Sequence, residues 1–287
     1  MEKIYVTDLD GTLFNLKAEI SEFSKKTLKE FLIKRRLAFF TARSYHVARK
    51  KLGDIPFNVP CAVLNGCYIV DYLSGEVYQK NILDFSIVKQ IIKLALERNI
   101  IPIAIYQCGT KEKMLYGEYY NNGYREYITQ RKNDNDDRLQ IFDFKSNLSI
   151  LEEIDCLTLQ FIDNEDKLIE LKNTISCFDI NCYLGKELYC KDVYYLNITP
   201  IKATKEDSLI TIAKILGVNT QNCVVFGDQE NDIGMFKIAG EAYAVENAID
   251  RLKLISTRVI ASNQNDGVAK HLKRIMLQDR GGKNNDR

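Results

Sequence analysis

Short apolar runs alternate with segments of helical periodicity along most of the chain. The runs are rich in β-branched and aromatic residues, and the segments between them place apolar side chains near every third or fourth position, as at Phe23, Leu28, Phe31 and Leu32. This alternation predicts an α/β fold with a mostly parallel, Rossmann-like sheet. The predicted strands are residues 3–8, 36–42, 61–66, 222–228, 241–245 and 258–262. The predicted crossover helices include residues 21–35 and 205–218, with Gly217 as the C-cap of the second.

The middle of the chain departs from this regular alternation. Residues 81–189 contain a helical stretch, further apolar strand-like runs, a Tyr-rich patch at 115–128 and a polar loop at 131–137. We interpret this segment as an inserted second domain. The last residues, from 279, are polar and glycine-containing, and we expect a solvated, frayed tail.

Polar side chains follow several predicted strands at the point where each strand ends. Asp8, Thr41, Asn65 and Asp228 all occupy such positions. The carboxyl ends of parallel strands share one edge of a sheet, where such sheets bind ligands, so we expect these residues to converge. Asp10 follows Asp8 by two residues, where the strand opens into a loop. Oxygen ligands without a His or Cys cluster suit Mg²⁺.

The same residues could carry out phosphoryl transfer. Asp8 is a candidate nucleophile, and Lys205 could offset the repulsion between carboxylate and phosphate. Asp10 could protonate the leaving alkoxide and then activate water. The Thr41 hydroxyl and the backbone N–H groups at the Gly11 turn could hold phosphate oxygens.

Each motif also has a structural interpretation. "DLDGT" fits a polar strand end followed by an Asp-Gly turn, and "GDQEND", residues 227–232, fits an Asx-rich helix N-cap. Lys205 fits an exposed helix lysine, and Arg43 an ion-pairing or packing residue. The order in which all the motifs occur together favours the phosphoryl-transfer hypothesis.

The motifs resemble those of the haloacid dehalogenase-like phosphohydrolases, and within them the Cof-type proteins of subfamily IIB. "DLDGTLFN" resembles the first motif, which implies Asp8 as nucleophile and Asp10 as acid/base. "FFTAR" resembles the second and implies Thr41 as a phosphate-binding hydroxyl. "KATKEDSL" resembles the third and implies Lys205 as the phosphate-binding lysine. "GDQEND" resembles the fourth and implies Asp228 as a metal carboxylate, with Asp8 and Asp10.

The resemblance also implies that Asn231 helps to bind substrate phosphate and that Asp232 supports the metal site. Three positions depart from the usual motifs. Ala42 and Glu206 stand where glycine is common, and Cys67 stands where alanine is common. None of the three removes a catalytic functional group, although Glu206 adds negative charge near the expected phosphate site.

By its position, the resemblance implies a discontinuous catalytic core at residues 1–82 and 189–276, a cap domain at 83–188 and a tail at 277–287. In such proteins the core contacts phosphate and metal, and the cap closes over the leaving group and sets substrate choice. The Tyr-rich patch could stack on a sugar or a planar ring, or could simply be a half-exposed helix or strand. We assign no cap residue to the substrate.

Composition narrows the classes of partner. Forty Lys and Arg residues balance 39 Asp and Glu residues, giving a net charge of +1 that disfavours nucleic acid and anionic membrane partners. Eight scattered cysteines and two histidines lack zinc-type spacing, which favours reduced thiols in a cytosol. We find no signal peptide and no apolar run long enough to span a membrane, so we expect a cytoplasmic protein.

Together these features predict a Mg²⁺-dependent phosphatase that hydrolyses a small phosphorylated metabolite, either a sugar phosphate or a phosphorylated cofactor, through an aspartyl-phosphate at Asp8. A sugar phosphomutase would use the same motifs and pass the phosphate to a second hydroxyl. A non-catalytic sensor of phosphorylated ligands would be expected to lack the nucleophile, the acid/base or the metal carboxylate, and all three are present. The motifs do not predict the oligomeric state.

Overall fold

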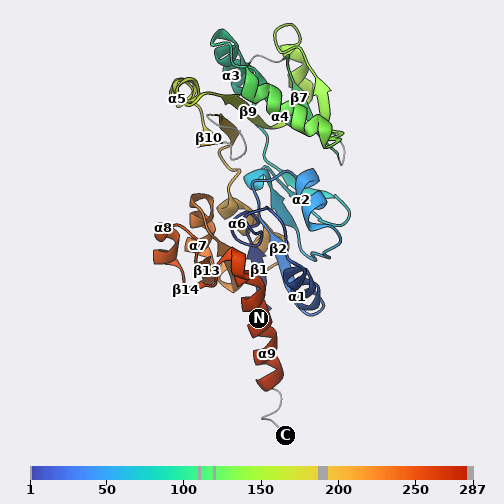
Figure 1. Cartoon of the computed structure of the whole chain (residues 1–287), viewed down its shortest axis with the longest axis vertical. Coiled ribbons are helices and arrows are strands. Elements are labelled where there is room, and N and C mark those ends of the chain that lie inside the picture. The colour runs from blue at the N-terminus through green and yellow to red at the C-terminus, as the bar shows by residue number, and fades with distance from the viewer. Residues whose placement is uncertain (1, 109–110, 119–120, 187–192, 283–287) are drawn as a thin grey trace. The chain divides into compact units, whose positions relative to one another are not determined.

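The chain folds into two compact units. The computed structural model describes residues 2–108, 111–118, 121–186 and 193–282 (Figure 1). Met1–Gln79 and Thr204–Arg287 form one unit, which we call the core unit, and Lys80–Ala203 form the other, which we call the inserted unit.

A five-stranded parallel sheet organises the core unit. Its strand order is β14-β13-β12-β1-β2, and every pairing is parallel. The strands are β1 (Ile4–Thr7), β2 (Arg36–Phe39), β12 (Cys223–Gly227), β13 (Glu241–Val245) and β14 (Arg258–Ile260). Because β1 and β12 are buried along their whole length, neither alternates apolar and polar residues. The predicted α/β class with a Rossmann-like parallel sheet is confirmed.

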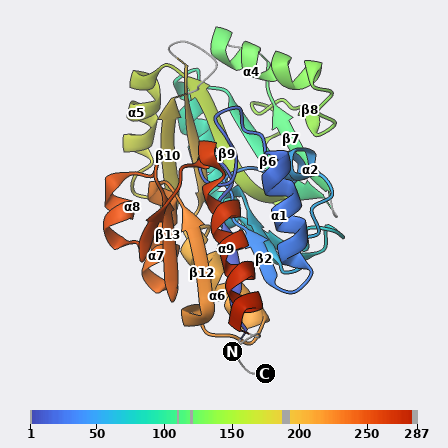
Figure 2. The same ribbon diagram turned by 60° about the horizontal axis from the view of Figure 1, so that its bottom comes forward.

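Helices cover this sheet. They are α1 (Glu22–Leu32), α2 (Tyr45–Leu52), α6 (Lys205–Ile215), α7 (Ile233–Ile238), α8 (Asp250–Ile255) and α9 (Gly267–Gly282). Helices α1 and α9 pack side by side on one face of the sheet (Figure 2), where Phe31 of α1 meets Tyr5 and His271 of α9 meets Phe226. Gly217 has a φ of +65° just after α6, consistent with the predicted C-cap.

One predicted strand is shorter than expected and lies outside the main sheet. Residues 61–66 divide into β3 (Cys61–Val63) and a 3₁₀ turn, η1 (Leu64–Gly66), because Asn65 takes a left-handed φ of 57°. Strand β3 pairs with β4 (Tyr68–Val70) in a three-stranded sheet completed by β5 (Val77–Lys80). A single parallel bridge from Phe40 to Ala62 joins it to the end of β2.

The inserted unit is built on a six-stranded sheet of order β10-β11-β9-β6-β7-β8, antiparallel except for the β7–β8 pair. Its strands are β6 (Pro102–Cys108), β7 (Lys111–Tyr116), β8 (Leu139–Ile141), β9 (Asp155–Asp163), β10 (Ile180–Lys186) and β11 (Tyr194–Pro200). Its helices are α3 (Phe85–Glu97), α4 (Asn122–Asn133) and α5 (Glu165–Thr174). Apolar residues of α3, α5 and the sheet form one core.

The boundaries differ from the predicted 83–188. Strand β11 pairs with both β9 and β10, so the inserted unit continues to Ala203 instead of ending before residue 189. At the carboxyl end, α9 continues to Gly282, so the chain is still helical where we expected a tail from residue 277; residues 283–287 lie outside the described residues.

Two further expectations concern side chains and membranes. Within the Tyr-rich patch, Tyr124 is fully buried, and its hydroxyl accepts from the Gly117 N–H (3.0 Å) and donates to the Pro102 carbonyl (3.3 Å); residues 119–120 lie outside the described residues. The six cysteines whose side chains are described are free thiols. In the described ranges, no helix is both long and apolar enough to cross a bilayer.

Candidate active site

Three buried carboxylates converge at the carboxyl edge of the core sheet. Asp8 directly follows β1 and Asp228 directly follows β12, and because these strands are parallel neighbours, both side chains emerge at the same edge. Asp232 joins them from the short turn η4 (Glu230–Asp232). Ligand oxygens of the three residues all lie within 4.8 Å of one another, and the residues are at most 6% exposed.

Lys205 lies among these carboxylates. It is the first residue of α6, whose N-cap Thr204 accepts a hydrogen bond from the Asp207 N–H at 2.9 Å. Its Nζ donates to Asp8 Oδ1 at 2.6 Å and to Asp232 Oδ1 at 2.5 Å. Lys205 is 1% exposed, which excludes the interpretation as a surface lysine. Burial alone would lower its pKa, but contact with Asp232 and Asp8 raises the pKa above the usual range.

Asp232 organises the loop after β12. Its Oδ2 accepts hydrogen bonds from the backbone N–H groups of Asp228 at 2.9 Å and Gln229 at 3.0 Å, and its Oδ1 accepts from Lys205. Asp232 is fully buried, and these bonds hold both the loop after β12 and Lys205 in place. This positioning role extends the supporting role expected from the sequence.

The buried charges change the acidity of the cluster. Burial raises the pKa of Asp228 to about 6, opposed by the hydrogen bond from Thr12 and reinforced by Asp232. Burial raises the pKa of Asp8 well above its usual range, with Lys205 opposing the shift and the two other carboxylates reinforcing it. Concentrated negative charge of this kind favours a bound cation, and an all-oxygen donor set fits Mg²⁺.

The Gly11–Thr12 pair fits tightly against Asp228. Gly11 has a φ of +75°, and a Cβ at this position would lie 2.3 Å from Asp228 Oδ2, so only glycine fits. Thr12 is buried, and its hydroxyl donates to Asp228 Oδ1 at 2.7 Å. The sequence motif contains Thr12, but its role in orienting a carboxylate from a distant strand was not predicted.

Asp10 is not one of the three grouped carboxylates, although its side chain was expected among the metal ligands. Both of its oxygens accept hydrogen bonds from Arg43, Nε to Oδ2 and Nη2 to Oδ1, each at 2.6 Å. The Arg43 guanidinium also lies 5.9 Å from the centroid of the Phe14 ring. Arg43 is therefore an ion-pairing arginine, which is one of the two structural roles that the sequence suggested for it. Its partner, the candidate acid/base, was not predicted.

The remaining candidates lie beside the same edge. Thr41 is 1% exposed, follows the end of β2, and its Oγ1 accepts the Arg43 N–H at 3.1 Å. Asn231 Nδ2 donates to Asn65 Oδ1 at 3.0 Å, which joins the turn after β12 to η1. Asn65 thus contacts a candidate phosphate-binding residue directly. The sequence marked Asn65 only by its position at the end of a predicted strand.

Two asparagines from the carboxyl-terminal part of the chain hold the Asp10–Phe14 loop. Asn247 Nδ2 donates to the Gly11 carbonyl at 2.8 Å, and Asn263 Nδ2 donates to the Phe14 carbonyl at 2.8 Å. The Asn263 N–H donates in turn to Asn247 Oδ1 at 2.9 Å. Neither role was predicted from the sequence.

The three departures from the motifs are accommodated. Ala42 does not take a positive φ, so it needs no glycine. Glu206 packs against α7, because a Cβ on Gly234 would lie 2.6 Å from its carboxylate. Cys67 is fully buried behind η1. At Gly66, a Cβ would lie 2.8 Å from the Thr204 carbonyl, so this glycine permits the close approach of η1 to the start of α6.

Comparison with known proteins agrees with this geometry. A sequence model of the haloacid dehalogenase-like hydrolases matches residues 5–272. The chain belongs to the haloacid dehalogenase-like hydrolase family. The match spans both units of the fold, so the expected family and its hydrolase class are confirmed.

Individual relatives of this hydrolase cover nearly its whole length. A Buchnera aphidicola protein, provisionally named a phosphatase, is 28% identical over 97% of this chain and 98% of its own. The Bacillus subtilis 5-amino-6-(5-phospho-D-ribitylamino)uracil phosphatase YwtE is 26% identical over 96% of this chain and 98% of its own. The crystal structure of TM0651 from Thermotoga maritima superposes with a TM-score of 0.77, at 26% identity, covering 96% of this chain and 97% of that one.

Proposed function

We propose that this hydrolase is a Mg²⁺-dependent phosphatase that acts on a small phosphorylated metabolite through an aspartyl-phosphate at Asp8. The observation that carries the proposal is the buried Lys205 ammonium between Asp8 and Asp232, next to Asp228. The cluster holds three buried carboxylates and one buried ammonium, so negative groups outnumber positive ones and a divalent cation would balance them. The bound cation and the Lys205 ammonium could then together accept a phosphate dianion.

The metal would be held by Asp8, by Asp228 and by the backbone near Asp10, with Asp232 supporting the site. When bound, Mg²⁺ supplies charge neutralisation for the phosphate. The loop that carries Asp228 is preorganised for this role, because Thr12 fixes one of its oxygens and Asp232 fixes its backbone N–H. Such preorganisation reduces the reorganisation needed during the reaction.

In the first step, an oxygen of Asp8 attacks phosphorus and the bond from phosphorus to the substrate oxygen breaks. Among the described residues no hydrogen bond reaches Asp8 Oδ2, so this oxygen is free to attack while Oδ1 is bound by Lys205. For this step Asp10 must enter protonated, with one of its oxygens released from Arg43, and it gives that proton to the leaving alkoxide.

In the second step, Asp10 takes a proton from water. The water oxygen bonds to phosphorus, and the bond from phosphorus to Asp8 breaks, which restores the carboxylate and releases inorganic phosphate. The Thr41 hydroxyl, the Gly11 turn, the Asn231 amide and the Lys205 ammonium hold the phosphate oxygens in both steps.

The inserted unit would act as the cap that recognises the leaving group. The core candidates offer contacts to phosphate and metal, so discrimination between substrates would have to come from elsewhere in the chain. We propose sugar phosphates and phosphorylated cofactors as the substrate class. The phosphatase name of the Bacillus subtilis relative, which includes a phosphorylated ribityl compound, supports that choice.

The test is phosphate release from a panel of sugar phosphates, nucleotides and phosphorylated cofactors, with Mg²⁺ or with EDTA. Wild type should release phosphate only with Mg²⁺, and Asp8→Asn should be folded and inactive. Activity that survives in Asp8→Asn would contradict the mechanism. Product analysis of each active substrate would reveal a mutase if an isomeric phosphate forms instead of inorganic phosphate. Binding without any turnover would indicate a sensor.

A further inference from the structure

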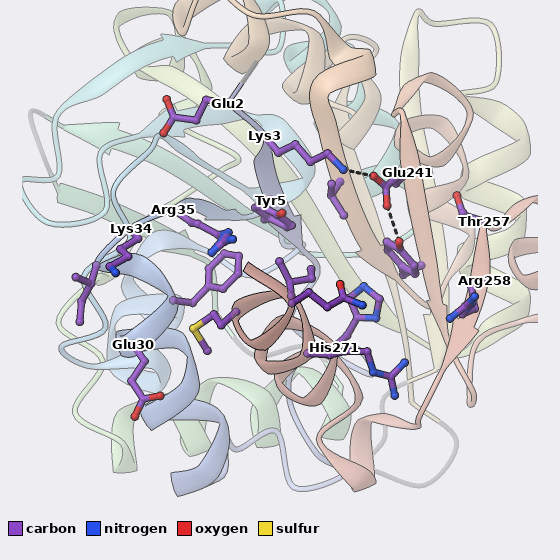
Figure 3. A pocket seen from close by; sticks show the side chains of 18 residues that line it. Glu2, Lys3, Tyr5, Glu30, Lys34, Arg35, Glu241, Thr257, Arg258 and His271 are labelled. Atoms are coloured by element: carbon purple, nitrogen blue, oxygen red, sulfur yellow. Dashed lines mark hydrogen bonds and ion pairs between the residues drawn. The ribbon is translucent and has the colours of Figure 1, made fainter. Parts of the chain in front are cut away.

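A groove of about 1300 Å³ lies at the amino edge of the core sheet (Figure 3). Its floor contains residues at the starts of strands, including Tyr5, Glu241 and Arg258, and its walls come from α1 and α9. Asp8 and Asp228 emerge at the opposite ends of these parallel strands. The groove is therefore separate from the candidate active site, and all of its lining residues belong to the core unit.

Most acids in the lining are already neutralised. Lys3 pairs with Glu241, which also accepts the Tyr243 hydroxyl at 2.5 Å (Figure 3). Glu2 pairs at 3.1 Å with Arg36, which is not part of the lining. These pairs satisfy two of the three acidic residues in the lining and only one of its cations.

The cations in the lining are less well matched. Within the described part of the chain, the lining residues Lys34, Arg258 and Arg274 form no ion pair. Glu30 is the one acidic residue of the lining that also forms none there. Arg258 and Arg274 are exposed. The groove thus presents a net positive surface although the whole chain is nearly neutral.

Both arginines line the groove together with the partly buried His271. The His271 ring lies 4.1 Å from the Tyr243 ring and 5.7 Å from the Phe226 ring between centroids, and Figure 3 shows His271 among the side chains that line the groove. Burial lowers the pKa of His271, and the charges of Arg274 on α9 and Arg258 on β14 lower it further, while Glu241 opposes them. Arg258 on β14 and Arg274 on α9 thus line the same groove as His271, from two different elements.

We propose that this groove is a second ligand site, which binds a nucleotide-sized polyphosphate through Arg258 and Arg274. The guanidinium fork matches phosphate oxygens and forms charge-assisted hydrogen bonds in pairs. The volume slightly exceeds the roughly 300–1,000 Å³ of common small-molecule pockets, as an extended ligand requires. Among the described residues that line the groove, no carboxylates group as they do at Asp8, Asp228 and Asp232, so its ligand binds without being hydrolysed there.

Calorimetric titration with ATP and with inorganic triphosphate, both in EDTA, tests the proposal. EDTA suppresses turnover, and without metal the buried carboxylates at the opposite edge repel anions. Wild type and Asp8→Asn should bind one equivalent of ATP alike. If ATP binds more tightly than triphosphate, the base and ribose contribute to the affinity. If the two bind equally, the phosphates alone supply it. Both results support the site.

The decisive comparison is between two double variants of equal charge. Arg258→Ala/Arg274→Ala should weaken ATP binding at least about tenfold, since each lost charge-assisted hydrogen bond costs roughly that much. Lys253→Ala/Lys273→Ala removes two cations of the core unit outside the groove and should bind like wild type. Equal weakening in both, no binding by wild type, or loss of binding in Asp8→Asn would overturn the proposal. These experiments measure binding and not turnover. They would therefore still test the groove if the protein proved not to be a phosphatase.

Discussion

The side-chain amide of Asn247 donates to the carbonyl oxygen of Gly11 at 2.8 Å, and this bond joins the turn after β13 to the loop that follows Asp8. The same Asn247 accepts the Asn263 N–H through its Oδ1, so both ends of its amide are used. The bond fixes the Gly11 peptide at a position where a Cβ is excluded by Asp228. Residues far from the nucleophile in sequence therefore control the geometry of its loop.

We expect Asn247→Ala to lower kcat about three- to tenfold with little change in KM, the loss that corresponds to one hydrogen bond. Asn265→Ala is the control, because the Asn265 side chain donates only to the nearby Ser262 hydroxyl. Steady-state kinetics on one substrate suffices. A change in KM alone, or equal losses in both variants, would contradict a positioning role.

The ion pair between Arg43 and Asp10 predicts a dependence on the leaving group. Arg43→Lys keeps the charge but loses the two-pronged geometry, so Asp10 should protonate an alkoxide less efficiently. The loss in kcat should be large for an alkyl phosphate and small for 4-nitrophenyl phosphate, whose leaving group needs no proton. Equal losses with both substrates would separate Arg43 from proton transfer.

Removal of the Lys205 charge should destabilise the fold. Lys205→Met leaves Asp8 and Asp232 buried without their shared cation, at a cost of about 3–5 kcal/mol in the free energy of unfolding. Lys202→Met, at an exposed position, should have almost no effect. Urea unfolding measures both. Addition of Asp8→Asn to Lys205→Met should recover part of the loss, and no recovery would contradict the electrostatic explanation.

The raised pKa of Asp228 predicts how stability depends on pH without metal. Folding raises this pKa from an ordinary 3.8 to about 6, so the folded state holds the proton more tightly and loses stability as pH rises through this range. Asp228→Asn should therefore be more stable than wild type at pH 7.5 in EDTA, by about 2–3 kcal/mol, given about 1.4 kcal/mol per pKa unit. Unfolding curves should show this gain disappearing near pH 4. A gain that persists there would have another cause.

Bound Mg²⁺ should offset the destabilisation that ionised Asp228 causes above its pKa. Protons and Mg²⁺ compete for Asp228, so Mg²⁺ affinity should fall as pH drops below about 6. Titration of thermal stability with Mg²⁺ at pH 5 and pH 7.5 measures this directly. Wild type should be stabilised mainly at the higher pH, and Asp228→Asn at neither. Equal stabilisation at both values would place the cation away from Asp228.

The sequence predicted the parts of the site that follow from local pattern. Asp8, Thr41 and Asp228 were placed at strand ends because apolar runs stop there, and parallel pairing then brings the strand ends to one edge. Lys205 was placed at the start of a helix, and its burial among carboxylates agrees with a functional interpretation. Residues 61–66 were predicted as one strand because their apolar run continues to Leu64. In the structure the strand ends earlier, because Leu64 and Asn65 have a left-handed backbone.

The contacts between segments distant in sequence were not predictable. Thr12 reaches Asp228, and Asn247 reaches Gly11, across more than 200 positions of sequence. No periodicity encodes such pairs, since each depends on the turn that ends a different strand. The end of the inserted unit differs from the predicted one for a similar reason. Strand β11 reads as one more apolar run before α6, and only its pairing with β9 and β10 assigns it to that unit.

The discontinuity of the core unit sets the order in which the chain can fold during synthesis. Strand β1 is made first, but one of its two neighbours, β12, begins at Cys223. The inserted unit is continuous from Lys80 to Ala203 and can fold as soon as it leaves the ribosome. Until β12 follows, β1 has an open edge able to pair with other chains. The strand that carries the nucleophile thus stays half-paired until Cys223–Gly227 have been made.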